Sequence, residues 1–293
     1  MGQTIINGLL IGGVYALIAV GLSMIHGVMK IVNFAQGELL AVGMYFSYLL
    51  YSFMPKGSLP YWLLIPVSIL MFIFGTLIFR TTISRVIGKG DSNYILLTLG
   101  LSYLIQNLLQ LIFSPNFLSL DVSNELKYGS VKIAGDSLIL MTPRLIAFVG
   151  ALVFVTLVSY FLSKTDLGRA MRTTSENSDI AEMLGVNTKV VYTIAFGLGT
   201  VFAGISGLLL TPMFLISPQI GTTFSTIAMC AMVLGGLGNL KGAMVGGLII
   251  GLVESLTTNY FSLDLTPVAI NSVLMLVLVL KPYGLFGKSG RTA

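Results

Sequence analysis

The chain has 293 residues, of which 55% are hydrophobic and only 9% are charged, and its formal net charge is +5. A soluble domain carries about 25% charged residues, so no soluble core of this length could bury so much apolar surface. The apolar stretches recur along the whole chain, which excludes a separate soluble domain and predicts an integral membrane protein. The positive charge is typical of basic cytoplasmic loops and does not by itself indicate nucleic acid or another anionic partner.

Apolar runs long enough to cross a bilayer recur from one end of the chain to the other. A membrane-spanning helix needs about 20 mostly apolar residues. The pattern predicts an all-α polytopic membrane protein of about 8 to 9 transmembrane helices, with broken or re-entrant segments, as a single transmembrane domain over 1–293. The run at 221–236 is short, and a half-helix is the alternative for it. The runs lie at 4–25, 34–53, 61–79, 92–113, 145–162, 190–210, 221–236, 240–258 and 265–281.

A break at 26–38, which carries glycine and polar residues, interrupts the apolar sequence between the first two runs and extends into the second. An ionisable residue beside an apolar run, here Glu38, indicates a functional group by default, although an acid also favours the positive end of the helix that follows. Asn33 and Gln36 either bond a polar substrate or satisfy backbone groups at the break, and we favour the second role. His26 is the only histidine and cannot form a metal site alone.

The longest loop on one predicted side of the membrane lies at about 114–144. Polar and apolar residues alternate at 128–136, before a Gly-Asp turn, which predicts a short β-hairpin. The loop is either a solvated linker or a docking surface for an external partner.

The loop at about 163–189, on the other side, is polar. Its residues 175–185 combine a candidate N-cap, early acidic residues and a closing glycine, which predicts a short helix outside the bilayer from about Ser175 to Leu184. Beyond this loop, small residues recur at 197–207 and 242–251 with spacings that let helices approach closely, so we assign these glycines to packing rather than chemistry.

A second break, at 235–242, resembles the first in carrying glycine, one Lys and one Asn between apolar helices. Paired interruptions in the two halves of a chain predict an internal repeat and a central transport pathway. The alternative is a pair of ordinary tight turns. The candidate pathway residues are His26, Asn33, Gln36, Glu38, Gly235, Gly236, Gly238 and Asn239.

Lys and Arg are unevenly divided between the two sides. If the N-terminus is outside and every run crosses, 12 of the 16 fall on one side, and Lys56, Lys127, Lys132 and Arg144 fall on the other. Because cytoplasmic loops carry the excess of Lys and Arg, the C-terminus is expected in the cytoplasm. A re-entrant pair in place of a span would invert part of this assignment.

The chain lacks the motifs of a motor or an enzyme. The string at 282–289 lacks the first glycine of a phosphate-binding loop and follows no strand. A single cysteine, Cys230, gives no cysteine metal site, and we find no catalytic serine-histidine-acid set and no cluster of acids for ion coupling. We therefore expect no enzyme activity, cofactor or metal. A transporter of this kind must borrow its energy, and the helix at 175–184 is the natural contact for a separate ATPase.

Ordered motifs along nearly the whole chain resemble the branched-chain amino acid (Liv-type) ABC transporter permeases, specifically the smaller of the two permease subunits. The matching segments are Gly21-Leu22-Ser23-Met24, Gly27-Val28, 32–38, 165–172, 184–187, 235–239 and 281–287. The sequence departs from the family pattern at Gln36, where histidine is frequent, and at His26, where an aromatic residue is frequent.

The resemblance implies a bacterial importer in the cytoplasmic (inner) membrane, surrounded by membrane lipid. In that family two related permeases form the pathway, two cytoplasmic ATPases drive it, and a periplasmic or lipid-anchored binding protein delivers the amino acid. The stretch 33–38 matches the family's central membrane break. The segment that matches the family's ATPase contact contains Gly168, Arg169, Arg172, Glu176, Asn177, Ala181 and Gly185.

Three other functions stay open at this point. Importers of urea and short-chain amides use closely similar permeases. A self-sufficient channel or ion-coupled carrier would need polar groups in its spans, and the sequence offers mainly Glu38 and Glu254. A membrane-embedded enzyme acting on lipid would need a nucleophile and a base, and no such pair is present.

Overall fold

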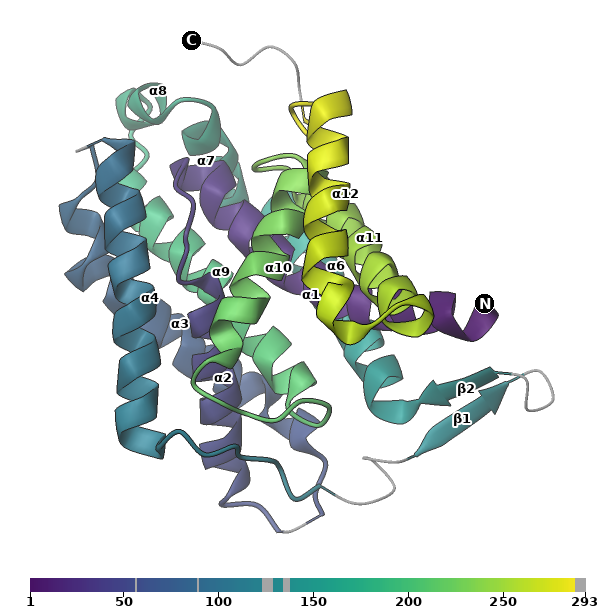
Figure 1. The fold of residues 1–293 in the computed structure, drawn as a ribbon. Helices are drawn as coiled ribbons and strands as arrows, with labels where there is room; N and C mark the ends of the chain where they lie inside the picture. The colour runs from purple at the N-terminus through teal and green to yellow at the C-terminus, as the bar shows by residue number, and fades with distance from the viewer. Residues whose placement is uncertain (56, 89, 123–128, 134–137, 288–293) are drawn as a thin grey trace.

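The computed structural model describes residues 1–293 except 56, 89, 123–128, 134–137 and 288–293. Each predicted apolar run coincides with a helix, and the all-α polytopic fold is confirmed (Figure 1). The helices of these runs are α1 (Gly2–Met29), α2 (Gln36–Tyr51), α3 (Leu64–Thr81), α4 (Asp91–Phe113), α6 (Thr142–Lys164), α9 (Thr188–Leu210), α10 (Ile220–Gly235), α11 (Leu240–Tyr260) and α12 (Thr266–Leu280).

Two of these helices, α2 and α10, are too short to cross a bilayer unaided, and α12, with 15 residues, reaches 18 only with the 3-10 turn Leu263–Leu265 before it. Seven helical segments in the described part of the chain are long and apolar enough to span it. α10 and α2 have 16 residues each, or about 24 Å at 1.5 Å per residue, against a hydrocarbon core of about 30 Å. The length of α10 agrees with the half-helix alternative, and α2 is shorter than the predicted run.

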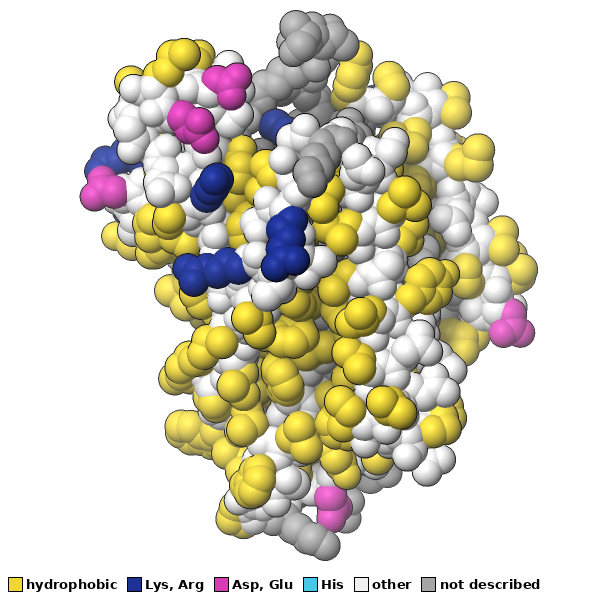
Figure 2. Space-filling model, turned by 90° about the vertical axis from the view of Figure 1, so that its left-hand side faces the viewer, with side chains coloured by type: hydrophobic (Ala, Val, Ile, Leu, Met, Phe, Trp, Pro, Cys, Tyr) yellow, Lys and Arg dark blue, Asp and Glu magenta, His cyan; other side chains and the backbone are white. Residues whose placement is uncertain are grey.

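The helices differ sharply in burial although they are similarly apolar. In α1 and α9, 94% and 83% of the most apolar stretch is buried inside the protein, whereas the figure is 11% for α6 and for the C-terminal span that contains α12. α1 and α9 therefore form the centre, and α6 and α12 face outward. Figure 2 shows hydrophobic side chains over the middle of the surface, as expected where lipid is the solvent.

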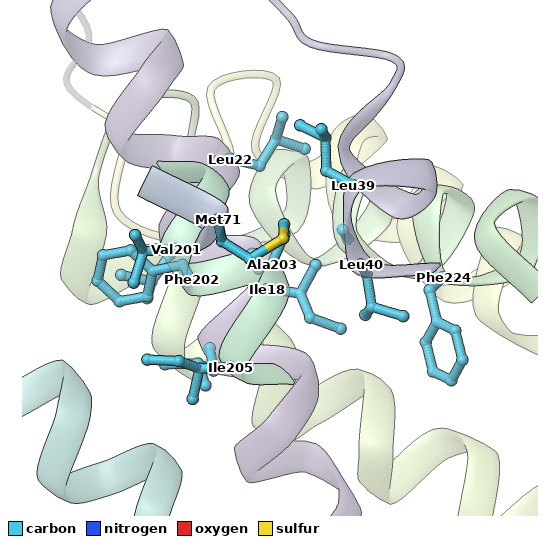
Figure 3. Close-up of a cluster of buried hydrophobic side chains, with 14 of the residues drawn as sticks. Ile18, Leu22, Leu39, Leu40, Met71, Val201, Phe202, Ala203, Ile205 and Phe224 are labelled. Atoms are coloured by element: carbon cyan, nitrogen blue, oxygen red, sulfur yellow. The ribbon is translucent and has the colours of Figure 1, made fainter. Parts of the chain in front are cut away.

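Close packing at the centre depends on small residues, as predicted. Gly8 of α1 lies against α11, where a Cβ would stand 2.9 Å from the carbonyl oxygen of Gly251. Gly43 of α2 and Gly204 of α9 are in similar contact. Figure 3 shows a cluster of buried hydrophobic side chains at this centre. Its labelled residues come from α1, α2, α3, α9 and α10.

The predicted β-hairpin is confirmed in its strands. β1 (Ser130–Ile133) and β2 (Leu138–Met141) pair antiparallel, with Ser130 opposite Met141. The predicted Gly-Asp turn, at 135–136, lies outside the described residues. The side chain of Gln3 donates a hydrogen bond to the Ile139 carbonyl and accepts one from the Ile139 N–H. These hydrogen bonds join the start of α1 to β2.

The polar segment between α6 and α9 forms two helices where one was predicted. α7 covers Asp166–Glu176 and α8 covers Ser178–Met183 (Figure 1). The predicted start near Ser175 is wrong, because that residue belongs to the last turn of α7. The helix starts after Asn177, whose side-chain oxygen accepts hydrogen bonds from the N–H groups of Asp179 and Ile180 at 2.9 and 3.1 Å.

Candidate functional site

The first break is held by buried amide side chains. α1 ends at Lys30, whose φ of 58° lies in the left-handed region, and α2 begins at Gln36. The Asn33 side chain accepts from the Ala35 N–H at 3.2 Å and donates to Gln36 Oε1 at 3.3 Å. Gln36 Nε2 donates to the Gly199 carbonyl of α9 at 3.1 Å. Asn33 thus bonds a backbone group at the break, as we favoured, whereas the backbone partner of Gln36 lies in α9.

We expect Gln36→Leu to lower the free energy of unfolding by about 1–3 kcal/mol, because it removes buried hydrogen bonds to Gly199 and Asn33. Thermal unfolding of the purified chain in detergent would measure this. Gln110→Leu is the matched control, since Gln110 is exposed on α4. Unchanged stability combined with impaired transport would instead assign Gln36 to the substrate.

Glu38 is fully buried in the first turn of α2. Its carboxyl group lies against the first turn of α10, where a Cβ on Gly221 would overlap it. Beside it, the Ser225 hydroxyl donates to the Phe34 carbonyl at 2.8 Å and accepts from the Gly37 N–H at 3.2 Å. Neither carboxyl oxygen has a hydrogen-bond partner among the described residues. The carboxyl group therefore lies beside the first turns of both α2 and α10, the positive ends of these helices.

The second break is a glycine turn closed by an asparagine. Gly236 and Gly238 have φ values of 107° and 75°, which favour glycine. Asn239 Oδ1 accepts from the Gly242 N–H at 3.1 Å and so caps α11, while its Nδ2 donates to the Phe286 carbonyl at 3.0 Å. Asn239 thus joins the start of α11 to the segment after α12.

That C-terminal segment covers the end of α10. The Leu285 N–H donates to the Leu234 carbonyl at 2.9 Å, and the Phe286 N–H donates to the Gly235 carbonyl at 3.1 Å. A Cβ on Gly236 would stand 2.7 Å from the backbone nitrogen of Gly287. Packing against this segment therefore accounts for glycine at 236, whereas a Cβ on Gly235 would overlap the backbone of Gly242 in α11.

The two breaks, at 26–38 and 235–242, lie far apart in sequence but meet in space. A Cβ on Gly27 would stand 3.1 Å from the Gly238 carbonyl oxygen, and one on Gly238 would stand 3.7 Å from the His26 ring. The predicted pathway residues therefore form two groups. His26 joins the second break, whereas Gln36 contacts α9, Glu38 lies against α10, and Asn33 bonds Gln36.

Two open cavities, of about 350 and 680 Å³, flank this junction. Lys30, Gly238 and Lys241 line both; Arg172 of α7 lines the smaller, and His26 lines the larger. Lys and Arg from separate elements thus gather at the end of the molecule that carries α7 and α8. Figure 2 shows Lys and Arg side chains in the upper half of the view, above the hydrophobic middle.

The predicted ATPase-contact residues shape the α7–α8 pair. Gly168 lets α7 approach α6, because a Cβ there would overlap the Leu162 carbonyl, and Gly185, with φ of 83°, ends α8. Arg169 forms an exposed ion pair with Asp166. Of the predicted residues, Gly168 and Ala181 are buried, and Arg169, Arg172, Glu176, Asn177 and Gly185 are exposed.

Sequence reasoning missed several residues of this region. Gly221 and Ser225, which surround Glu38, lie inside an apolar run and show no signal that separates them from packing residues. Lys30 and Lys241 were visible as single cations in the two breaks. That signal could have placed them among the site candidates.

A bundle of apolar helices, with two breaks that meet near the α7–α8 pair, defines a polytopic α-helical membrane protein. The family model described as "Branched-chain amino acid transport system / permease component" matches residues 4–281. The chain therefore belongs to this family of permeases, as the sequence resemblance predicted.

Curated relatives match along almost their whole length. The chain is 31% identical to the "High-affinity branched-chain amino acid transport system permease protein LivH" of Salmonella typhimurium, over 98% of this chain and 95% of the relative. It is 30% identical to LivH of Escherichia coli and 28% identical to BraD of Pseudomonas aeruginosa, with the same coverage. No solved structure gives a significant match.

Proposed function

We propose that this chain is one membrane-spanning subunit of an ATP-driven importer for branched-chain amino acids or closely related solutes. The observation that carries the proposal is the exposed apolar surface of α8. Ile180, Met183 and Leu184 are 53%, 86% and 71% exposed, at the charged end of the protein. An apolar patch outside the hydrocarbon region indicates a protein partner.

The partner proposed for this surface is a cytoplasmic ABC ATPase. α7 lies between the patch and the junction, because Gly168, Met171 and Arg172 line the same cavity as Gly27 and Gly238. Movement of an ATPase bound to α8 would therefore reach both breaks through α7. A second permease subunit and an external solute-binding protein complete the proposed importer.

The proposed location is the bacterial cytoplasmic membrane, with α7, α8 and the C-terminus in the cytoplasm. Support comes from the cations that gather at this end, Lys30, Arg172 and Lys241. Excess positive charge marks the cytoplasmic side of membrane proteins.

Reconstitution in proteoliposomes tests the proposal. Uptake of radiolabelled leucine should require this chain, the second permease, the ATPases, the binding protein and ATP, and omission of any one should abolish it. Affinity purification from native membranes should recover the same partners. Ion-driven uptake by this chain alone would contradict the proposal and favour the carrier alternative. Uptake of urea but not leucine would correct the substrate.

A further inference from the structure

Three cations from distant parts of the sequence line the cavity of about 350 Å³. Lys30 follows α1, Arg172 lies on α7, and Lys241 lies at the start of α11. All three are exposed, and Lys30 Nζ also donates to the Gly27 carbonyl at 3.3 Å. No carboxylate belongs to the described lining. The cavity therefore attracts an anion.

The remaining wall of the cavity is apolar or weakly polar. Met24 and Val28 come from α1, Leu162 from α6, and Leu237 and Leu240 from the second break. Four serines accompany them, from α1, α6 and α7. Because α6 is one of the least buried helices, the cavity borders an element that faces lipid. It combines a cationic rim with an apolar wall that continues toward the bilayer.

We propose that this cavity binds the phosphate headgroup of an anionic phospholipid from the leaflet on the α7 side. The phosphate would lie among Lys30, Arg172 and Lys241, and an acyl chain would follow the apolar wall to α6. Basic pockets between membrane helices bind anionic headgroups in this way. An amino acid substrate fits less well, since its ammonium group would meet three cations and no carboxylate.

The position of the cavity gives the bound lipid a role. Gly27 and Gly238, where the two breaks touch, are lining residues, as is Gly168 of α7. A headgroup that bridges Lys30, Lys241 and Arg172 would hold both breaks and α7 in the arrangement seen here. The lipid would then stabilise one conformation of the permease.

Native mass spectrometry of the whole purified chain in non-ionic detergent tests the proposal, with phosphatidylglycerol and phosphatidylcholine of matched acyl chains as probes. We expect preferential retention of phosphatidylglycerol. The triple variant Lys30→Asn, Arg172→Gln, Lys241→Gln should weaken it roughly a hundredfold, at about fivefold per cation. Asn suits position 30 because it tolerates positive φ.

The matched control removes three exposed charges that do not line the cavity, by Arg80→Gln, Arg85→Gln and Lys189→Gln. This control should leave the affinity for phosphatidylglycerol within about twofold, because salt screens exposed charges that do not line the cavity. If the triple variant does not fold, Arg172→Gln alone provides the test, because Arg172 lies outside the bundle core. This single variant should weaken lipid binding about fivefold. Equal losses in both triple variants would overturn the proposal in favour of general surface charge. Displacement of the lipid by millimolar inorganic phosphate would overturn it in favour of a free-anion site.

Discussion

Ala181→Pro is expected to abolish ATP-driven import while leaving the amount of folded protein in the membrane unchanged. Ala181 is fully buried within α8, and its N–H donates to the Asn177 carbonyl at 3.1 Å. Proline removes that donor, clashes with the same carbonyl and costs about 3 kcal/mol in a helix interior. At about 1.4 kcal/mol per factor of ten, the equilibrium between formed and unformed α8 shifts roughly a hundredfold toward the unformed state.

The consequence reaches transport because α8 presents the proposed ATPase surface. Without the helix, Met183 and Leu184 no longer have fixed positions. Movement of the proposed ATPase would then not reach the two breaks through α7. The assay is ATP-driven leucine uptake by the reconstituted importer, with ATPase binding measured by co-purification. Insertion should persist, because α8 lies outside the spans.

Ser178→Pro, three residues before Ala181, is the control for placing a proline in α8. Ser178 is the first residue of α8, where proline is well accommodated, and Asn177 before it already has the extended φ and ψ of −156° and 115°. Import by this variant should be near normal. Normal import by Ala181→Pro would show that α8 does not transmit the motion, and equal failure of both variants would mean that the loop tolerates no proline.

Hydropathy predicted where the helices are but not how they are arranged. The α1 span and the C-terminal span have mean hydropathies of 2.2 and 2.1, yet 94% of the first and 11% of the second are buried in the protein. Lipid tails are as apolar as a protein core, so the sequence carries little signal that separates a central helix from a peripheral one. In this chain glycine content is more informative, since Gly8, Gly12 and Gly13 mark α1 as closely packed.

The breaks were predictable from sequence, but their contact was not. The polar and glycine residues at 26–38 and 235–242 interrupt apolar runs visibly. Contact between Gly27 and Gly238 depends on how α1 lies against α10 and α11, which no local pattern encodes. The same holds for Gln36, whose partner Gly199 is 163 positions away.

The α7–α8 boundary was missed because two cap candidates compete. Ser175 and Asn177 both precede acidic residues, and either can start a helix. Ser175 already belongs to α7, whose helix continues to Glu176, and there its hydroxyl donates to the Arg172 carbonyl at 2.8 Å. Only Asn177 has the extended backbone that an N-cap requires.

Gly247→Ala is expected to lower the free energy of unfolding by about 3 kcal/mol, the upper end of the usual cost of overpacking, and to deplete folded protein. A Cβ at this position of α11 would overlap the backbone of Ala16 and stand 2.8 Å from the carbonyl carbon of Tyr15. These atoms belong to the buried centre of α1, so no side chain can rotate away and the helices themselves must separate. Natural stabilities of about 5–15 kcal/mol leave little margin for that loss.

Gly100→Ala is the matched control, because Gly100 lies in α4 and a Cβ there would have no other atom within 4 Å. At this position alanine removes only the poor helix propensity of glycine, worth about 1 kcal/mol, so stability should stay the same or rise. Thermal unfolding and size-exclusion profiles in detergent compare the two variants directly. If both variants behave like the parent chain, α1 and α11 do not pack in close backbone contact at Gly247. If both fail, the membrane spans tolerate no added methyl group, and the burial difference between the helices has no energetic meaning.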